Sequence, residues 1–171
     1  MFRILLILSL FLPFNSFAKT QFNQYFNNKQ LVGDARFRYY FWDVYDIALY
    51  APQGRYDPDF PFGLKIDYLR ELKGGKIAKV SVDEMREIGF KNKPKLQYWY
   101  FLMKDIFPDV AVGDSLIGIY RPNQGSYFYN ENGDQIGVIL DDDFGKYFFG
   151  IWLNEKTSMP DVRVRLLSGN S

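Results

Sequence analysis

Apolar residues recur along the chain with two different periods, and the period changes from one region to the next. From Val32 to Tyr50 the density of β-branched and aromatic residues favours strand, either as a pair of strands or as one long bent strand. Prolines, a glycine and aspartates mark Pro52 to Pro61 as a loop. In Phe62 to Leu69 apolar and polar residues largely alternate, which predicts a strand with one buried face.

Two amphipathic helices are predicted in the middle of the chain. Apolar residues recur at spacings of three to five in Lys76 to Ile88 and of three and four in Pro94 to Phe107. Pro94 suits the first turn of the second helix, and Pro108 ends it.

The strand signal returns after the second helix. Ser115 to Arg121, Gly125 to Asn130 and Gln135 to Leu140 each predict a short strand. Asn132 and Gly133 tolerate the left-handed conformations of a tight hairpin turn, so the last two strands are expected to pair.

A third helix is predicted from Asp141 to Leu153. Three consecutive aspartates stand at its start, where carboxylates complement the helix N-terminus; their contiguous spacing does not suit a calcium loop. Thr157 or Ser158 is expected to cap a last short helix, with Pro160 near its first position.

This order of elements predicts an α+β fold: a large, mostly antiparallel sheet with helices layered on one face. The chain has 171 residues, which suits one domain with a real hydrophobic core. We place that domain at residues 19–171 and expect residues 19–29 to form a polar arm that joins the sheet late.

Residues 1–18 have the pattern of a secretory signal peptide. Arg3 precedes an apolar run from Ile4 to Phe14, and the small residues Ser16 and Ala18 suit cleavage after Ala18. The run is shorter than the roughly 20 residues of a membrane span, so no stable span is expected. The protein is therefore expected to be secreted, or periplasmic if its source is a Gram-negative bacterium.

Composition narrows the chemistry. Without Arg3 the chain has 20 basic and 20 acidic residues with the signs interspersed, which argues against a nucleic-acid partner. Absence of cysteine and histidine excludes thiolate and imidazole ligands, disulfides and serine–histidine catalysis. No metal and no cofactor are expected.

Arg36 and Tyr45 are the candidate ligand-binding residues. If the chain turns back between Tyr40 and Phe41, antiparallel pairing sets Arg36 directly across from Tyr45 on one face of the sheet. A guanidinium and a phenol can together donate hydrogen bonds to one carboxylate. The pair would suit a fatty acid or a similar amphipathic anion.

The residues alone also support a simpler alternative. Arg36 can form an internal ion pair with Asp34, Asp43 or Asp46. Tyr40 and Phe41 are, moreover, poor residues for a tight turn.

Several motifs resemble the bacterial chalcone-isomerase-like family, which is related to plant chalcone isomerases and plastid fatty-acid-binding proteins. They are VGDAR, VYDIALYAP, GDSLIGIYRPNQGSYFYNENGDQIG and FFGIWL, in that order. The resemblance covers about Leu31 to Leu167. It implies an open-faced β-sandwich with a ligand cleft between the sheet and the helices.

The resemblance also implies roles for residues. In the fatty-acid-binding relatives an arginine and a tyrosine hold the carboxylate, and they match Arg36 in GDAR and Tyr45 in VYDIALY. The interval between them is shorter here than in the plant proteins, so Arg38 is a rival for the arginine role.

The enzymatic branch fits less well. True chalcone isomerases carry a threonine where Tyr45 stands, and a tyrosine and an asparagine on the following helix; Gly74 to Phe90 contains neither. The expected function is therefore non-catalytic binding of a small amphipathic carboxylate. The alternatives are an isomerase with Arg36 as electrophile and Tyr45 as proton donor, and an envelope interaction protein with a closed core.

Overall fold

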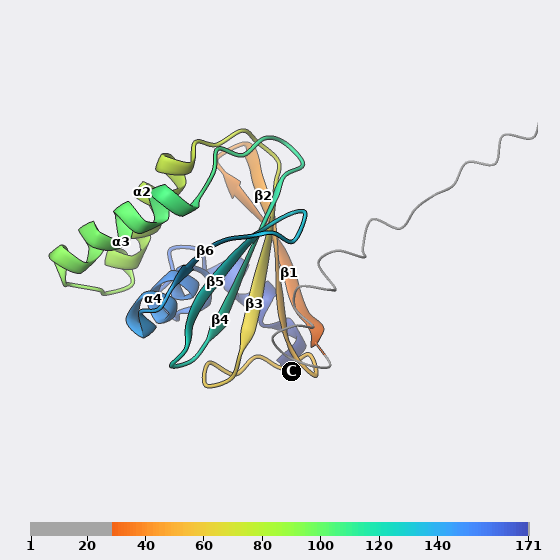
Figure 1. Cartoon of the computed structure of the whole chain (residues 1–171). Coiled ribbons are helices and arrows are strands. Elements are labelled where there is room, and N and C mark those ends of the chain that lie inside the picture. The colour runs from red at the N-terminus through yellow and green to blue at the C-terminus, as the bar shows by residue number, and fades with distance from the viewer. Residues whose placement is uncertain (1–28, 171) are drawn as a thin grey trace, which may run out of the picture.

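The computed structural model describes residues 29–170, and in them helices lie on one side of a single six-stranded sheet (Figure 1). The strands are β1 (Lys29–Tyr39), β2 (Trp42–Pro52), β3 (Phe62–Tyr68), β4 (Ser115–Arg121), β5 (Gly125–Asn130) and β6 (Gln135–Ile139). The helices are α2 (Gly74–Glu87), α3 (Lys93–Ile106), α4 (Asp142–Leu153), α5 (Pro160–Leu166) and the 3-10 turn η1 (Ser168–Asn170).

The sheet has the simplest possible order. Each strand pairs antiparallel with the next one in sequence, from β1 to β6, and α2 and α3 are inserted between β3 and β4. The predicted α+β fold, a large antiparallel sheet with helices on one face, is confirmed.

The main core lies between the sheet and the helices. Alternate residues of the central strands, such as Ile47, Leu49 and Leu64, are buried there, and Trp99 and Phe149 meet them from the helices. The opposite face of the sheet carries a smaller buried cluster of Ile117, Ile119 and Tyr129. Because side chains alternate between faces, a residue's position along its strand decides which cluster it joins.

Most predicted elements form within a few residues of their expected ends. Asn92 caps α3, since its side chain accepts a hydrogen bond of 3.1 Å from the backbone N–H of Lys95, and Pro94 lies in the first turn. In the β5–β6 connection only Gly133 of the expected Asn132–Gly133 pair is left-handed, with φ of 86°.

The predicted cap of the last helix is wrong. Met159 occupies the N-cap position of α5, and no side chain caps that helix. The buried hydroxyl of Thr157 is used instead to fix the α4–α5 link: it donates to the carbonyl of Ile151 at 2.5 Å and accepts from the N–H of Met159 at 3.1 Å. Ser158 donates its hydroxyl to Glu84 of α2.

The expected signal peptide at residues 1–18 and most of the expected arm, up to residue 28, lie outside the described residues. Within residues 29–170, no helix is both long and apolar enough to cross a membrane.

Candidate functional site

The turn between β1 and β2 lies where the sequence predicts it. Tyr39 pairs with Trp42, and Tyr40 and Phe41 form a two-residue turn. Tyr40 adopts a left-handed conformation with φ of 54°, which Gly and Asn adopt more readily. The turn is thus correct in place although its residues are unusual.

The register beyond the turn differs from the prediction. Arg38 pairs with Asp43 but Phe37 pairs with Tyr45, so Val44 is an extra residue, a β-bulge in β2. From Phe37 back to Gly33 every partner is displaced by one residue, and a second irregularity between Gly33 and Leu31 restores the original register. Side chains alternate between the two faces of a strand. A displacement of one residue therefore puts each side chain on the opposite face of the sheet from its predicted partner.

Arg36 therefore lies opposite Asp46, and the predicted pairing of Arg36 with Tyr45 is wrong. Its Nε and Nη2 atoms donate to the two carboxylate oxygens of Asp46 at 2.7 and 2.9 Å, and Nη1 donates to Asp43 at 3.1 Å. The hydrogen bond to Asp46 raises the pKa of Arg36 above its already high value. The internal ion pair that the sequence left open is thus the arrangement found, on the face of the sheet away from the helices.

Tyr45 points the other way, into the space between sheet and helices. Its ring stacks on Phe37 with centroids 4.9 Å apart. The indole Nε1 of Trp152 donates to its hydroxyl at 2.9 Å, and the hydroxyl donates to the sulfur of Met159 at 3.8 Å. Burial raises the pKa of Tyr45 well above 10, so the phenol is protonated at neutral pH.

Tyr45 lines an apolar cavity of about 700 Å³ between the sheet and helices α2 and α4. This volume lies within the usual range of small-molecule sites. The walls are mostly aliphatic and aromatic side chains, among them Phe37, Leu64, Ile66, Ile77, Leu116, Phe128, Phe148, Phe149, Ile151 and Trp152. The cleft that the family resemblance implies is therefore present and is open.

Arg70 lines the cavity just beyond the end of β3. Its guanidinium carbon lies 4.1 Å from the centroid of the Trp42 ring, and its Nε donates to the backbone carbonyl of Asp43 at 3.2 Å. Among residues 29–170 no carboxylate forms an ion pair with Arg70. Its terminal nitrogens are thus available to a ligand anion.

Tyr68 lies two residues before Arg70 and lines the same cavity. Burial raises the pKa of Tyr68 above 10, which keeps its hydroxyl a hydrogen-bond donor. Arg38, the rival for the arginine role, also borders the cavity, but its Nε is bound to Asp43 and its side chain is mostly exposed.

Three residues of the site were not predicted from the sequence: Arg70, Tyr68 and Trp152. The alternation in Phe62 to Leu69 does put Tyr68 on the buried face, and Arg70 continues the same parity. That signal could have placed a cation at one end of the inner face, but it does not show that a cavity lies there.

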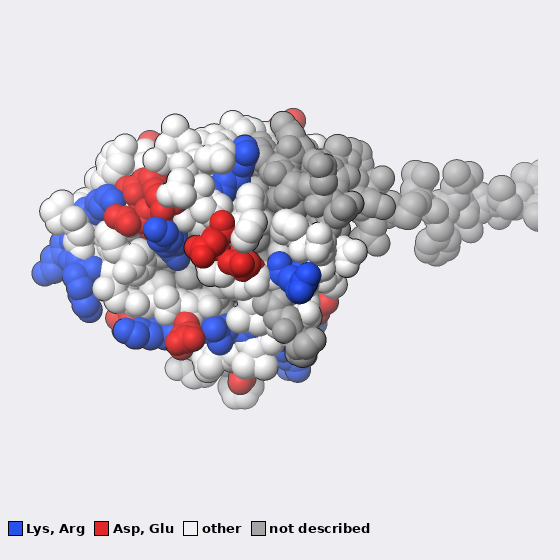
Figure 2. Space-filling model, turned by 90° about the horizontal axis from the view of Figure 1, so that it is seen from below, with Lys and Arg blue, Asp and Glu red and all other residues white. Residues whose placement is uncertain are grey.

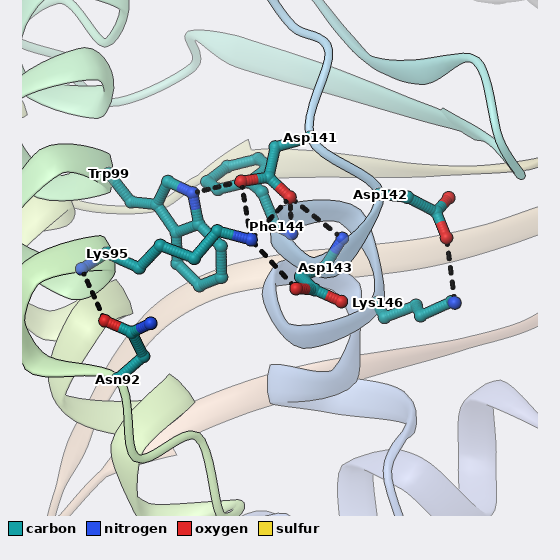
Figure 3. A network of polar contacts seen from close by, with 8 residues as sticks. All are labelled: Asn92, Lys95, Trp99, Asp141, Asp142, Asp143, Phe144 and Lys146. Atoms are coloured by element: carbon teal, nitrogen blue, oxygen red, sulfur yellow. Dashed lines mark hydrogen bonds and ion pairs between the residues drawn. The ribbon is translucent and has the colours of Figure 1, made fainter.

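The acidic run at the start of α4 is a capping network, as predicted (Figure 3). Asp141 is the N-cap and accepts from the backbone N–H of Asp143 at 3.1 Å. The same carboxylate accepts from the indole of Trp99 at 3.1 Å, and Lys95 binds both Asp141 and Asp143. These contacts tie α3 to α4.

The isomerase hypothesis required Arg36 and Tyr45 to act on one substrate. The two side chains lie on opposite faces of the sheet, and the guanidinium of Arg36 is bound to Asp46 and Asp43. The structure therefore does not bring the two residues together in one site.

The chalcone isomerase-like family model matches residues 19–168, and the chain belongs to this family. An uncharacterized protein of Haemophilus influenzae is 26% identical over 147 residues, which are 83% of this chain and 69% of that protein. The crystal structure of the Arabidopsis thaliana fatty-acid binding protein AtFAP1 is similar with a TM-score of 0.65 and 13% identity, over 85% of this chain and 89% of that one.

Proposed function

We propose that this protein is a non-catalytic binding protein for a small amphipathic carboxylate, such as a fatty acid. The observation that carries the proposal is the apolar cavity of about 700 Å³ that borders Arg70, an arginine without a carboxylate partner in residues 29–170. The similarity to AtFAP1, a fatty-acid binding protein, supports it through the fold.

The apolar walls would hold the hydrocarbon chain. Each methylene moved from water into such a cavity contributes about 0.8 kcal/mol, so affinity should rise roughly fourfold per added methylene until the cavity is full. This dependence on length is the signature of chain burial and distinguishes it from binding of the carboxylate alone.

Arg70 would hold the carboxylate, with the hydroxyl of Tyr68 as a second donor. Both side chains line the cavity. Hydrogen bonds between charged groups contribute on the order of 1.5–3 kcal/mol, enough to select an anion over its neutral analogue. Tyr45, already bound to Trp152 and Met159, would serve as wall rather than as head-group ligand.

The test is a titration of delipidated protein with saturated fatty acids, using Arg70→Gln and the matched control Arg55→Gln. We expect Arg70→Gln to weaken binding of the carboxylate by about tenfold or more. Arg55→Gln should change the affinity by less than about twofold, since Arg55 is exposed in the loop between β2 and β3, away from the cavity. Absence of fatty-acid binding, or equal effects of the two substitutions, would contradict the proposal.

Secretion through residues 1–18 belongs to the same proposal. Expression of the full chain in a Gram-negative host should yield a periplasmic protein whose first residue is Lys19. A cytoplasmic product that retains Met1 would contradict this part and leave the binding proposal intact.

A further inference from the structure

The β1–β2 turn exposes four consecutive aromatic residues. Tyr39, Tyr40, Phe41 and Trp42 are 61%, 79%, 95% and 56% exposed. Scattered apolar residues are normal on a protein surface, but an adjoining group of large ones marks a site of interaction.

The conformation of the turn does not explain these residues. Tyr40 is left-handed, with φ of 54°, and a tyrosine pays a steric cost there that glycine or asparagine would largely avoid. Its ring meets the neighbouring ring of Tyr39 edge-on, with centroids 4.8 Å apart. The side chain of Tyr40 therefore costs the folded turn free energy without filling the core.

Basic residues flank the aromatic turn. The hollow beside it is lined by Arg36, Arg38 and Arg70 against the single carboxylate of Asp43. Asp46, which does not line the hollow, forms an ion pair with Arg36, and Arg70 has no carboxylate partner among the described residues. On the opposite end of the sheet, seen from below in Figure 2, acidic and basic side chains are interspersed.

The aromatic turn is continuous with the cavity. Arg38, Trp42 and Arg70 border both the hollow at the turn and the apolar cavity. A surface that contacts the turn therefore also reaches the cavity entrance.

We propose that the β1–β2 turn docks on the surface of a lipid bilayer that contains anionic lipids. Tyrosine and tryptophan partition to the level of the head groups, and arginines beside them attract anionic lipids. A stable complex with a protein partner would bury roughly 800 Å² of surface on each side, which is far more than one two-residue turn offers. A bilayer can be bound through a few aromatic side chains with basic neighbours.

The proposal can be tested with the tryptophans of the chain. Trp42 is exposed, whereas Trp99 and Trp152 are buried, so a change of emission on adding vesicles reports the turn. Vesicles of phosphatidylcholine with phosphatidylglycerol should shift the emission to the blue and co-sediment the protein. Pure phosphatidylcholine should bind at least about fivefold more weakly, since each nearby arginine contributes on the order of 1 kcal/mol at an anionic surface.

Phe41→Glu and its control Phe60→Glu locate the contact. Phe60 is 59% exposed in the loop at the far end of β2, so its replacement carries the same change of charge away from the turn. We expect Phe41→Glu to lower vesicle binding on the order of tenfold and Phe60→Glu to leave it unchanged.

Two outcomes would overturn the docking proposal: no shift of Trp42 emission in the wild type, which would leave a protein partner for the turn, or equal effects of the two substitutions. Fatty-acid affinity measured without vesicles should be the same in Phe41→Glu and the wild type. The docking and binding proposals therefore fail independently.

Discussion

The indole Nε1 of Trp152 donates a hydrogen bond of 2.9 Å to the phenolic oxygen of Tyr45, and so joins helix α4 to strand β2 at the wall of the cavity. The two residues are 107 positions apart in the chain. This contact holds α4 against the strand that carries the bulge.

Tyr45→Phe should destabilise the protein by about 1–3 kcal/mol, because it leaves the indole N–H of Trp152 without its partner. Urea unfolding measures the difference. Tyr39→Phe, the same substitution at an exposed position, is the control and should be neutral. Equal midpoints for the two variants would show that the hydrogen bond contributes little.

Alkaline pH should destabilise the fold through its buried tyrosines. Burial raises the pKa of Tyr45 and of Tyr68 above the value of 10.0 in the unfolded chain, and that of Tyr56 to about 12. Groups with raised pKa values contribute their full stabilisation below pH 10 and lose it as pH rises toward the folded-state values. Urea midpoints should fall steeply above pH 10 in the wild type and less steeply in Tyr45→Phe/Tyr68→Phe; equal slopes would contradict this.

Acid pH should destabilise the fold through Asp142 at the start of α4. Its carboxylate binds Lys146 at 2.8 Å and accepts from Tyr120 and the N–H of Asn123, and the bond to Lys146 is the main cause that lowers its pKa to about 2. Because this pKa is lowered from 3.8, the ionised carboxylate stabilises the folded protein above pH 3.8. That stabilisation is lost as the pH falls toward 2. Asp142→Asn should therefore destabilise at pH 6 more than at pH 2.5, whereas Asp105→Asn, without an ion pair, should have little effect at either pH.

Two adjacent glycines should respond in opposite ways to alanine. A Cβ on Gly74 would lie 2.0 Å from the carbonyl oxygen of Phe107, whereas one on Gly75 would meet nothing within 4 Å. Gly74→Ala should lower the urea midpoint markedly, and Gly75→Ala should leave it unchanged or raise it, because alanine suits a helix better. Equal midpoints would contradict the close approach.

Filling the cavity should shorten the preferred ligand. Ser81 lines the cavity and donates its hydroxyl to the carbonyl of Ile77 in its own helix, so no distant partner depends on it. Ser81→Leu should move the optimum of a fatty-acid series to shorter chains, while Ser81→Ala, which keeps the space, should not. Titration calorimetry across the series measures this, and an unchanged optimum would place the chain elsewhere.

The strands, the helices and even the two-residue turn follow from the sequence, because periodicity and prolines report local structure. The bulge does not: Val44 is an ordinary strand residue, and neither a glycine nor a proline marks it. That one extra residue moved Arg36 to the outer face. A local pattern therefore predicted the element correctly and its partner residue wrongly.

The pattern of residues alone could not predict the cavity, which only the family resemblance implied. Aromatic residues that fill a core and those that line a cavity have the same pattern in sequence, and only the spacing between sheet and helices separates them. Arg70 is a further example, because its lack of an acidic partner depends on where Asp43 and Asp46 are bound, and they are bound by Arg36 and Arg38.

The sequential strand order has a consequence for how the chain folds. β1, β2 and β3 form one meander and β4, β5 and β6 another, joined by loops of nine residues or fewer that close at modest entropic cost. In the part of the chain that the structure describes, β3 and β4 are the one pair of neighbouring strands that two helices, α2 and α3, separate in the sequence. Among the strand pairings, the one of longest range is thus that of β3 with β4.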